Sequence, residues 1–355
     1  MQDRYGIDSH KLMFHIERLN EWLNGKKIFP IYLEIAPSGS CNHRCTFCAL
    51  DYLGYLPRFI DFKVLKKTIA QAATGGVKSV MYAGEGEPLL HKDICDIVEF
   101  TKKSGIDTAI TSNGVLLKEE VSKRILPFLT WLRISLNAGT KKTYAKVHRT
   151  SEEDFNKVIH NLKTAVRIKK LHKLSATLGV QILLIPDNMD EVLALAKILK
   201  KIGIDYLTVK PYSQHPLSQT HLNSTIDYSR FDFLNRNLSK LESKSFKICF
   251  RYETMRRLSE KKDYRYCLGL PFWAYIDASG NVYACSAFLG EKDFLCGSIY
   301  KSDFKDIMMG KIRASIIKRC AAKLDVNKCR EVCRLDKINS YLWDLKYPSG
   351  HINFI

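Results

Sequence analysis

Short apolar runs alternate with helical patterns along residues 29–215, and this alternation limits the fold more than any other feature of the sequence. Each run is typical of a buried strand, and each stretch between two runs has the spacing of an amphipathic helix. Repeated strand–helix units build a parallel sheet covered by helices. The predicted strands span residues 31–37, 77–84, 108–114, 132–139, 178–186 and 206–212.

This pattern predicts an α/β fold, a partial (β/α)6 TIM-like barrel whose ligands lie at the carboxyl ends of its strands. Beyond residue 215 come a polar stretch, a helix, a hairpin near residues 274–285 and irregular cysteine-rich chain. We therefore expect four parts. They are an N-terminal helical extension (1–28), the partial barrel (29–215), a linker with helical character (216–262) and a small α+β domain (263–355).

The chain holds 11 cysteines, without a secretory signal or an apolar run long enough to span a membrane. These features favour the cytoplasm, where thiols stay reduced and clustered cysteines more often bind metals than form disulfides. Three cysteines lie together near the N-terminus, and most of the others lie beyond residue 248. We expect two separate metal sites.

Cys41, Cys45 and Cys48 form a C-x3-C-x2-C motif directly after the first predicted strand. Three thiolates are one short of the four protein ligands that zinc and iron–sulfur clusters usually take. On a [4Fe–4S] cluster they would leave one iron open to a small molecule. From the spacing alone, the alternatives are a structural zinc site completed by His43, or thiols without metal.

The second predicted strand ends in a G-x-G-E-P motif, formed by Gly84, Gly86, Glu87 and Pro88. Glycines let the backbone approach a ligand closely, and a carboxylate there can pair with an ammonium group. With both motifs in this order, residues 30–215 resemble the radical S-adenosylmethionine (radical SAM) superfamily. The usual form of the motif is G-G-E-P, whereas Glu85 stands between the two glycines here.

The resemblance implies that the three motif cysteines bind a [4Fe–4S] cluster and that the methionine part of SAM chelates the open iron. It also implies that Glu87 contacts the SAM amino group. Other positions match residues that hold the rest of SAM in relatives. They are Ser135 and Asn137 for the ribose, Asn113 at the same rim, Arg149 for the carboxylate and Val209 for the adenine.

The C-terminal cysteines resemble the SPASM domain and its shorter relative, the twitch domain, which carry auxiliary iron–sulfur clusters. Their spacings are C-x12-G-x4-C at Cys267, Gly280 and Cys285, and C-x3-C at Cys329 and Cys333. One cysteine of the full SPASM pattern is replaced by lysine, and none follows Cys333, so two ligands of a second auxiliary cluster are missing. The resemblance implies one auxiliary [4Fe–4S] cluster on Cys267, Cys285 and two of Cys320, Cys329 and Cys333, of which we favour Cys329 and Cys333. A structural zinc knuckle is the alternative.

Cys249 and Cys296 lie outside both cysteine motifs. Cys249 alternates with apolar residues, which favours a place in the core. The alternative is that one of the two donates a hydrogen atom to a substrate radical, which would make the enzyme an epimerase. A Cys→Ala variant with an unchanged product yield would exclude that role.

The resemblance implies a radical SAM oxidoreductase or epimerase. Reductive cleavage of SAM gives a 5′-deoxyadenosyl radical, which takes a hydrogen atom from the substrate. An auxiliary cluster that accepts the second electron suits dehydrogenation, and one that relays electrons suits epimerisation. A reductant such as flavodoxin or ferredoxin is then a partner.

The identity of the substrate is the property that the sequence constrains least. Only 40 residues precede Cys41, fewer than the leader-binding domain with which peptide-modifying relatives often begin. This favours a small polar molecule, sugar-like or anionic, over a peptide, and the net charge of +19 is compatible with an anion. A basic zinc protein that binds nucleic acid is the alternative of another class, but it would not explain the G-x-G-E-P motif. We expect neither a membrane nor a nucleic acid as partner.

Overall fold

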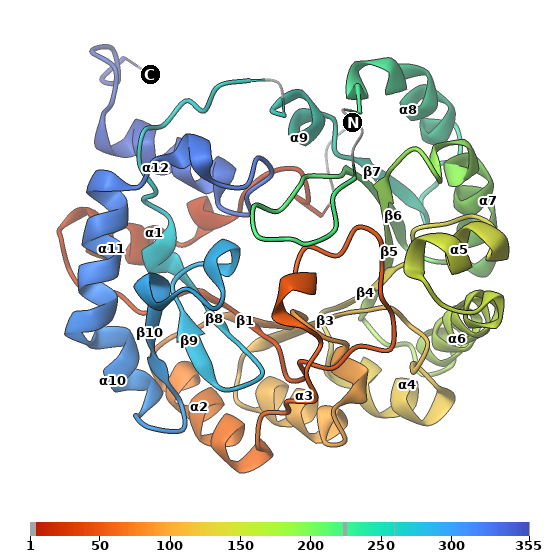
Figure 1. Cartoon of the computed structure of the whole chain (residues 1–355), viewed down its shortest axis with the longest axis horizontal. Coiled ribbons are helices and arrows are strands. Elements are labelled where there is room, and N and C mark those ends of the chain that lie inside the picture. Colours follow the sequence, from red (N-terminus) through yellow and green to blue (C-terminus); the bar gives the residue numbers. More distant parts are fainter. Residues whose placement is uncertain (1–4, 223–225, 259, 355) are drawn as a thin grey trace.

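The computed structural model describes residues 5–222, 226–258 and 260–354, which fold around a ten-stranded sheet (Figure 1). The strand order is β10-β9-β8-β1-β2-β3-β4-β5-β6-β7. The pairs from β8 to β7 are parallel, and β9 and β10 add antiparallel pairs at one end. The strands are β1 (Tyr32–Ile35), β2 (Ser79–Tyr82), β3 (Asp107–Ser112), β4 (Trp131–Ser135), β5 (Thr177–Leu184), β6 (Tyr206–Pro211), β7 (Lys247–Phe250), β8 (Trp273–Ile276), β9 (Asn281–Tyr283) and β10 (Leu295–Ser298).

All six predicted strands are present as β1 to β6, in chain order and in parallel. The sheet is longer than predicted, because β7 pairs with β6 at one end and β8 pairs with β1 at the other. The predicted hairpin is formed by β8 and β9, whereas β7 lies in the segment 216–262, where we expected a linker and a helix. Pairing with distant strands, β6 for β7 and β1 for β8, adds these two strands to the sheet, and such pairing is not visible in local sequence.

Helices cover the outside of the curled sheet (Figure 1). α2 begins after Asp61, whose carboxylate accepts hydrogen bonds from two backbone N–H groups of the first turn. α7 ends at Gly203, which adopts the left-handed φ of 94° that glycine tolerates best. The helices around the barrel are α2 (Phe62–Thr74), α3 (Ile94–Lys103), α4 (Glu119–Ile125), α5 (Lys141–His148), α6 (Glu152–Leu171), α7 (Val192–Ile202), α8 (Asp232–Ser239), α9 (Tyr252–Arg256), α10 (Phe304–Met309) and α11 (Lys311–Lys323).

Alternation along the strands separates the core from the barrel interior. On β1, Leu33 and Ile35 are fully buried in the main apolar core, whereas Glu34 lines an internal cavity. On β6, Val209 belongs to the core and Lys210 lines the same cavity. The strands thus present polar and charged side chains to the inside of the barrel.

The first and the last α-helix of the chain pack beside the start of β8. α1 (Ile16–Leu23) and α12 (Asp336–Lys346) share an apolar cluster that contains Leu19, Phe272 and Leu342. This cluster joins the N-terminal helix to the cysteine-rich C-terminal region. Among the described residues, no helix is both long enough and apolar enough to cross a bilayer.

Candidate functional site

The first cysteine motif lies in the loop after β1, at the carboxyl end of the barrel. Cys41, Cys45 and Cys48 are half-buried and line one cavity of about 190 Å³. Burial raises the pKa of Cys41 to about 11 and also raises the pKa values of Cys45 and Cys48. Neighbouring thiols add to the shifts of Cys41 and Cys45, because charges that lie close together disfavour one another. Three converging thiols are a donor set that fits an iron–sulfur cluster with one open iron.

Both glycines of the G-x-G-E-P motif are required by backbone packing. A Cβ on Gly86 would lie 2.3 Å from the carbonyl oxygen of Ser40 and 2.4 Å from that of Ser38. Gly84 has a φ of +114°, and a Cβ there would lie 2.5 Å from the Cβ of Ala36. Both glycines therefore admit the protein's own loop, which begins after β1 and carries the cysteines. They also line the cavity of the three cysteines, and their approach to a ligand there stays a prediction.

We expect Gly86→Ala to destabilise the metal-free protein by about 1–3 kcal/mol or more, because the added Cβ has no room beside two carbonyl oxygens. The displaced loop should also retain less iron after reconstitution. Urea denaturation and iron analysis measure the two effects. Gly350→Ala is the matched control, since a Cβ there meets nothing within 4 Å. Equal stability of the two variants would contradict this packing.

Glu87 is buried at the end of β2 and caps the short helix that starts at Pro88. Its carboxylate accepts hydrogen bonds from Leu89 N at 3.0 Å, Ser112 Oγ at 2.8 Å and Asn113 N at 2.8 Å. Burial raises the pKa of Glu87, and these hydrogen bonds oppose the rise. A carboxylate has about four acceptor sites, so capacity remains for an ammonium group.

The other predicted SAM positions fall into two groups. Asn113 and Ser135 line the cavity of the three cysteines. Asn137 is buried, and its side-chain oxygen accepts a hydrogen bond from Leu183 N at 2.7 Å, so it ties the end of β4 to β5. Four predicted positions, all within the described chain, do not line this cavity: Pro88, Asn137, Arg149 and Val209.

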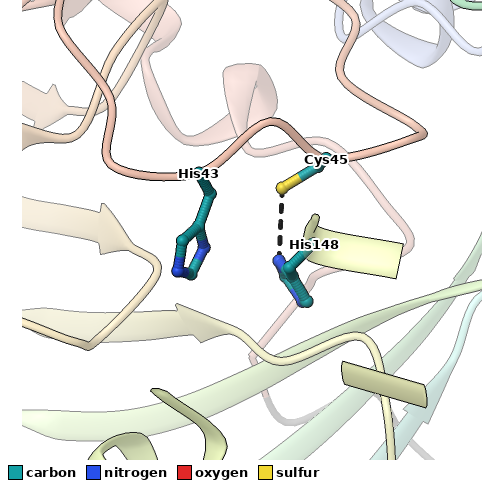
Figure 2. Close-up of side chains that lie close together, drawn as sticks. All are labelled: His43, Cys45 and His148. Atoms are coloured by element: carbon teal, nitrogen blue, oxygen red, sulfur yellow. Dashed lines mark hydrogen bonds between the residues drawn. The ribbon is translucent and has the colours of Figure 1, made fainter. Parts of the chain in front are cut away.

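His148, which the sequence analysis did not assign, lies against the cysteine loop (Figure 2). It ends α5, is buried, and places Nδ1 3.2 Å from the Sγ of Cys45. Burial holds the pKa of His148 well below its usual value, which favours the neutral ring. Nε2 accepts from the backbone N–H of Asn137 at 3.3 Å, which assigns the proton to Nδ1 and makes His148 the donor to the sulfur. A lone histidine at a helix end carries no sequence signal for this contact.

His43 completes a group of three metal-binding side chains. The ligating atoms of His43, Cys45 and His148 lie within 4.8 Å of one another. His43 Nε2 also contacts Asp154 at 3.3 Å. Such a group suits zinc as well. The presence of Cys41 and Cys48 in the same cavity favours the set of three thiols.

A second cavity collects cysteines of the C-terminal region. The four that line it are Cys267, Cys285, Cys329 and Cys333. Burial raises the pKa of each thiol, and the neighbouring thiols add to the rise for the first three. Lys262 and Arg330 line the same cavity and can offset the negative charge of thiolates. Four converging thiols match the ligand count of a [4Fe–4S] cluster.

Cys320 does not line the second cavity, and neither do Cys249 and Cys296. Cys320 is buried in α11. Cys249 is half-buried on β7 beside Thr208 of β6, and Cys296 is buried on β10. This arrangement supports Cys329 and Cys333 over Cys320 as ligands. The hydrogen-donor role of Cys249 or Cys296 stays a prediction.

A central cavity of about 640 Å³ lies inside the barrel, between the loop of the first cysteine set and two cysteines of the second. Its wall includes Ala49 and Leu50, directly after Cys48, and also Cys285 and Cys333. The charge of the wall is mainly positive, since Glu34 is the one acid among the described residues that line it. The cationic residues of the wall are Lys11, Arg133, Lys210, Arg251, Arg330 and Arg334.

A curled parallel β/α sheet with a three-cysteine loop after β1 and a G-x-G-E-P turn after β2 defines the class of radical SAM proteins. Residues 35–199 match the radical SAM superfamily. The chain therefore contains a radical SAM domain, which confirms the resemblance, and the cofactors of this family are SAM and a [4Fe–4S] cluster.

Among curated proteins, the chain is similar to the GTP 3′,8-cyclase of Chlorobaculum tepidum, with 28% identity over 195 residues, 53% of this chain and 56% of that protein. It is 34% identical over 140 residues to a probable GTP 3′,8-cyclase of Saccharolobus solfataricus, which is 38% of this chain and 44% of that protein. The chain thus spans about half the length of these relatives.

Two solved structures share the fold. The crystal structure of Streptococcus suis SuiB bound to S-adenosylmethionine matches with a TM-score of 0.67 and 19% identity, over 91% of this chain and 76% of that chain. Native anSMEcpe with bound AdoMet matches with a TM-score of 0.56 and 18% identity, over 89% and 95%. These matches confirm the barrel-like α/β fold.

Proposed function

We propose that this chain is a radical SAM enzyme that abstracts a hydrogen atom from a small, polar, anionic substrate in the central cavity. The observation that carries the proposal is the position of this cavity, whose wall includes residues next to Cys48 as well as Cys285 and Cys333. A molecule bound there would contact the loop that follows Cys48 and the cysteines of the second set. When bound, SAM and a reduced cluster supply a 5′-deoxyadenosyl radical, and an auxiliary cluster supplies an electron acceptor.

The chain's own residues would bind and orient these groups. Cys41, Cys45 and Cys48 would hold the first cluster, while Glu87 and the cavity residues Asn113 and Ser135 would hold SAM. The four cysteines of the second cavity would hold one auxiliary cluster of SPASM or twitch type. The barrel wall keeps bulk water away from the reacting atoms, which protects a radical from unwanted hydrogen donors.

Dehydrogenation fits the cavity better than epimerisation. Removal of one hydrogen atom leaves a substrate radical, and loss of one electron to the auxiliary cluster together with one proton completes a two-electron oxidation. Epimerisation instead needs a hydrogen donor next to the substrate. Cys249 and Cys296, the two predicted donors, do not line the described part of the central cavity.

An anionic small molecule is the favoured substrate because of the positive cavity wall. The curated relatives are named for GTP, which is itself a small anion. A peptide is the second candidate, since SuiB also matches in its structure with the precursor peptide SuiA, with a TM-score of 0.65. A nucleic-acid-binding zinc protein is not retained, because it does not account for the radical SAM match.

We place the enzyme in the cytoplasm, where thiols remain reduced and where flavodoxin or ferredoxin can supply the electron. The test is anaerobic reconstitution with iron and sulfide, followed by reduction and chromatography for 5′-deoxyadenosine. Formation of 5′-deoxyadenosine from SAM would support the proposal. A protein with its full complement of iron that forms none under strong reductant would contradict it.

His148 should tune the first cluster through its hydrogen bond to Cys45. A donor to a ligand sulfur stabilises the reduced cluster, so we expect His148→Phe to lower the reduction potential. A hydrogen bond to a charged group is worth about 1.5 kcal/mol, which corresponds to about 60 mV for one electron. Phenylalanine keeps the stacking on Tyr144, at 4.2 Å between ring centroids. Redox titration followed by electron paramagnetic resonance measures the shift.

Two further variants control this measurement. His148→Gln retains a side-chain donor and should restore part of the potential, whereas the exposed His160→Phe should leave it unchanged. A potential in His148→Phe equal to that of the unaltered protein would show that His148 has only a packing role.

A further inference from the structure

We propose that the central cavity binds a phosphorylated molecule and that Arg133, Lys210 and Arg330 hold its phosphate groups. The inference rests on the proposed function for the cavity's role as substrate site. Phosphate binding itself requires no radical chemistry, so the phosphate site and the proposed reaction can be tested separately.

Two of the cavity's cations are already neutralised by the protein. Arg334 pairs with Glu34 at 2.8 Å, and Arg251 pairs with Asp8 at 3.3 Å. The structure gives no carboxylate partner to Arg133, Lys210 or Arg330 among the residues that it describes. Arg330 also borders the thiols of the second cavity, whereas Arg133 and Lys210 are half-buried without a carboxylate partner, and this arrangement favours an anionic ligand.

The two arginines have donors to spare. Arg133 Nη2 donates to Thr111 Oγ1, and Arg330 Nη2 donates to the carbonyl of Ser213, each at 3.3 Å. The Nε of each guanidinium is buried and lacks a hydrogen-bond partner within the described chain. A guanidinium has five N–H donors, so others on each arginine remain for an acceptor oxygen in the cavity.

The three cations act as one group, although they come from three places in the chain. Arg133 lies on β4, Lys210 on β6, and Arg330 between Cys329 and Cys333. Burial lowers the pKa of Lys210 well below its usual value, and Arg330, Arg251 and Arg133 lower it further. All three line the same cavity, so one ligand bound there can meet several of them.

The charge of the group points to phosphate. The three side chains together offer more donors than one carboxylate can accept, whereas a phosphate monoester has more acceptor oxygens and carries about −1.5 to −2 at neutral pH, a charge that would favour the protonated form of Lys210. Guanidinium forks also match phosphate oxygens in pairs. Trp131, Tyr206 and Trp273 line the same cavity and give it an apolar wall beside the cations. The substrate class is therefore a phosphate or diphosphate ester of a small organic molecule.

The experiment measures binding of inorganic pyrophosphate to the reconstituted enzyme by isothermal titration calorimetry. We expect Lys210→Met and Arg330→Met to weaken binding at least tenfold relative to the unaltered enzyme. Lys200→Met is the matched control, because it removes one exposed lysine on α7 and the same unit of charge. It should bind pyrophosphate as the unaltered enzyme does.

Thermal unfolding without ligand keeps the test independent of any folding defect. Removing a cation from a repelling group should leave the melting temperature of Lys210→Met equal to or above that of Lys200→Met. Equal pyrophosphate affinity in these two variants, or no millimolar binding to the unaltered enzyme, would overturn the inference. If pyrophosphate binds through Lys210 but SAM is not cleaved, the proposed function fails and this inference stands. If SAM is cleaved but pyrophosphate does not bind, this inference fails and the proposed function stands.

Discussion

We expect Cys45→Ala to lower the rate of reductive SAM cleavage more than about 100-fold, since loss of a partner that only supports a ligand can already cost 10–100-fold. Cys45 lies in the cavity that it shares with Cys41 and Cys48, and it accepts the hydrogen bond from His148. Without its sulfur, two thiols remain for a cluster that the proposal holds with three. Anaerobic chromatography of 5′-deoxyadenosine measures the loss.

The matched control is Cys95→Ala. Cys95 is buried in α3 and lines neither cysteine cavity, so its loss changes thiol count and packing without touching the proposed ligands. Far-UV circular dichroism should show that both variants are folded, because Cys45 lies in a loop outside the sheet. SAM cleavage by Cys45→Ala within twofold of Cys95→Ala would rule out the three-cysteine cluster.

The second large effect concerns the auxiliary cysteines. We expect about eight irons per chain in the reconstituted protein and about four in the double variant Cys329→Ala/Cys333→Ala, because each four-iron cluster needs its own set of thiolates. These two residues meet Cys267 and Cys285 in one cavity. Iron and sulfide analysis gives the count, and electron paramagnetic resonance gives the number of distinct clusters.

Cys320→Ala provides the comparison for this count. Cys320 is buried in α11 and lies outside the described lining of the cavity, so its variant should retain about eight irons. The double variant should still cleave SAM, since its first cysteine motif is intact, but it should not oxidise substrate. A fall to about four irons in Cys320→Ala would show that Cys320 is a ligand of the auxiliary cluster in place of Cys329 or Cys333.

The barrel strands were predictable because their signal is local. β1 to β6 are runs of apolar residues bounded by helices, and each is long enough to show this pattern without its neighbours. The first cysteine motif was equally accessible, because its three residues fall within eight positions of one loop. The sheet does not stop at the predicted domain boundaries, because β7 and β8, which follow the predicted barrel in sequence, belong to the same sheet as β1 to β6.

Other parts of the site depend on contacts between distant residues. His148 contacts Cys45 across 103 positions, and Gly86 packs on Ser40, so neither role leaves a trace in nearby sequence. Glu85, which stands between the two motif glycines, is a further case. In the structure it accepts hydrogen bonds from Arg58 at 2.8 Å and from Ala278 N at 2.6 Å, which joins the motif to the β8–β9 hairpin.

The sequence by itself determined the class of chemistry, since thiolates at a given spacing and a strand-end glycine motif are chemical facts of the chain. It also determined the β/α order, because strand and helix periods are local properties of side chains. Only the tertiary structure decided which four C-terminal cysteines converge and which face of each strand lines the cavity. Those are questions of distance in space, and Arg133, Lys210 and Arg330 become one group only when β4, β6 and the cysteine-rich segment enclose the same cavity.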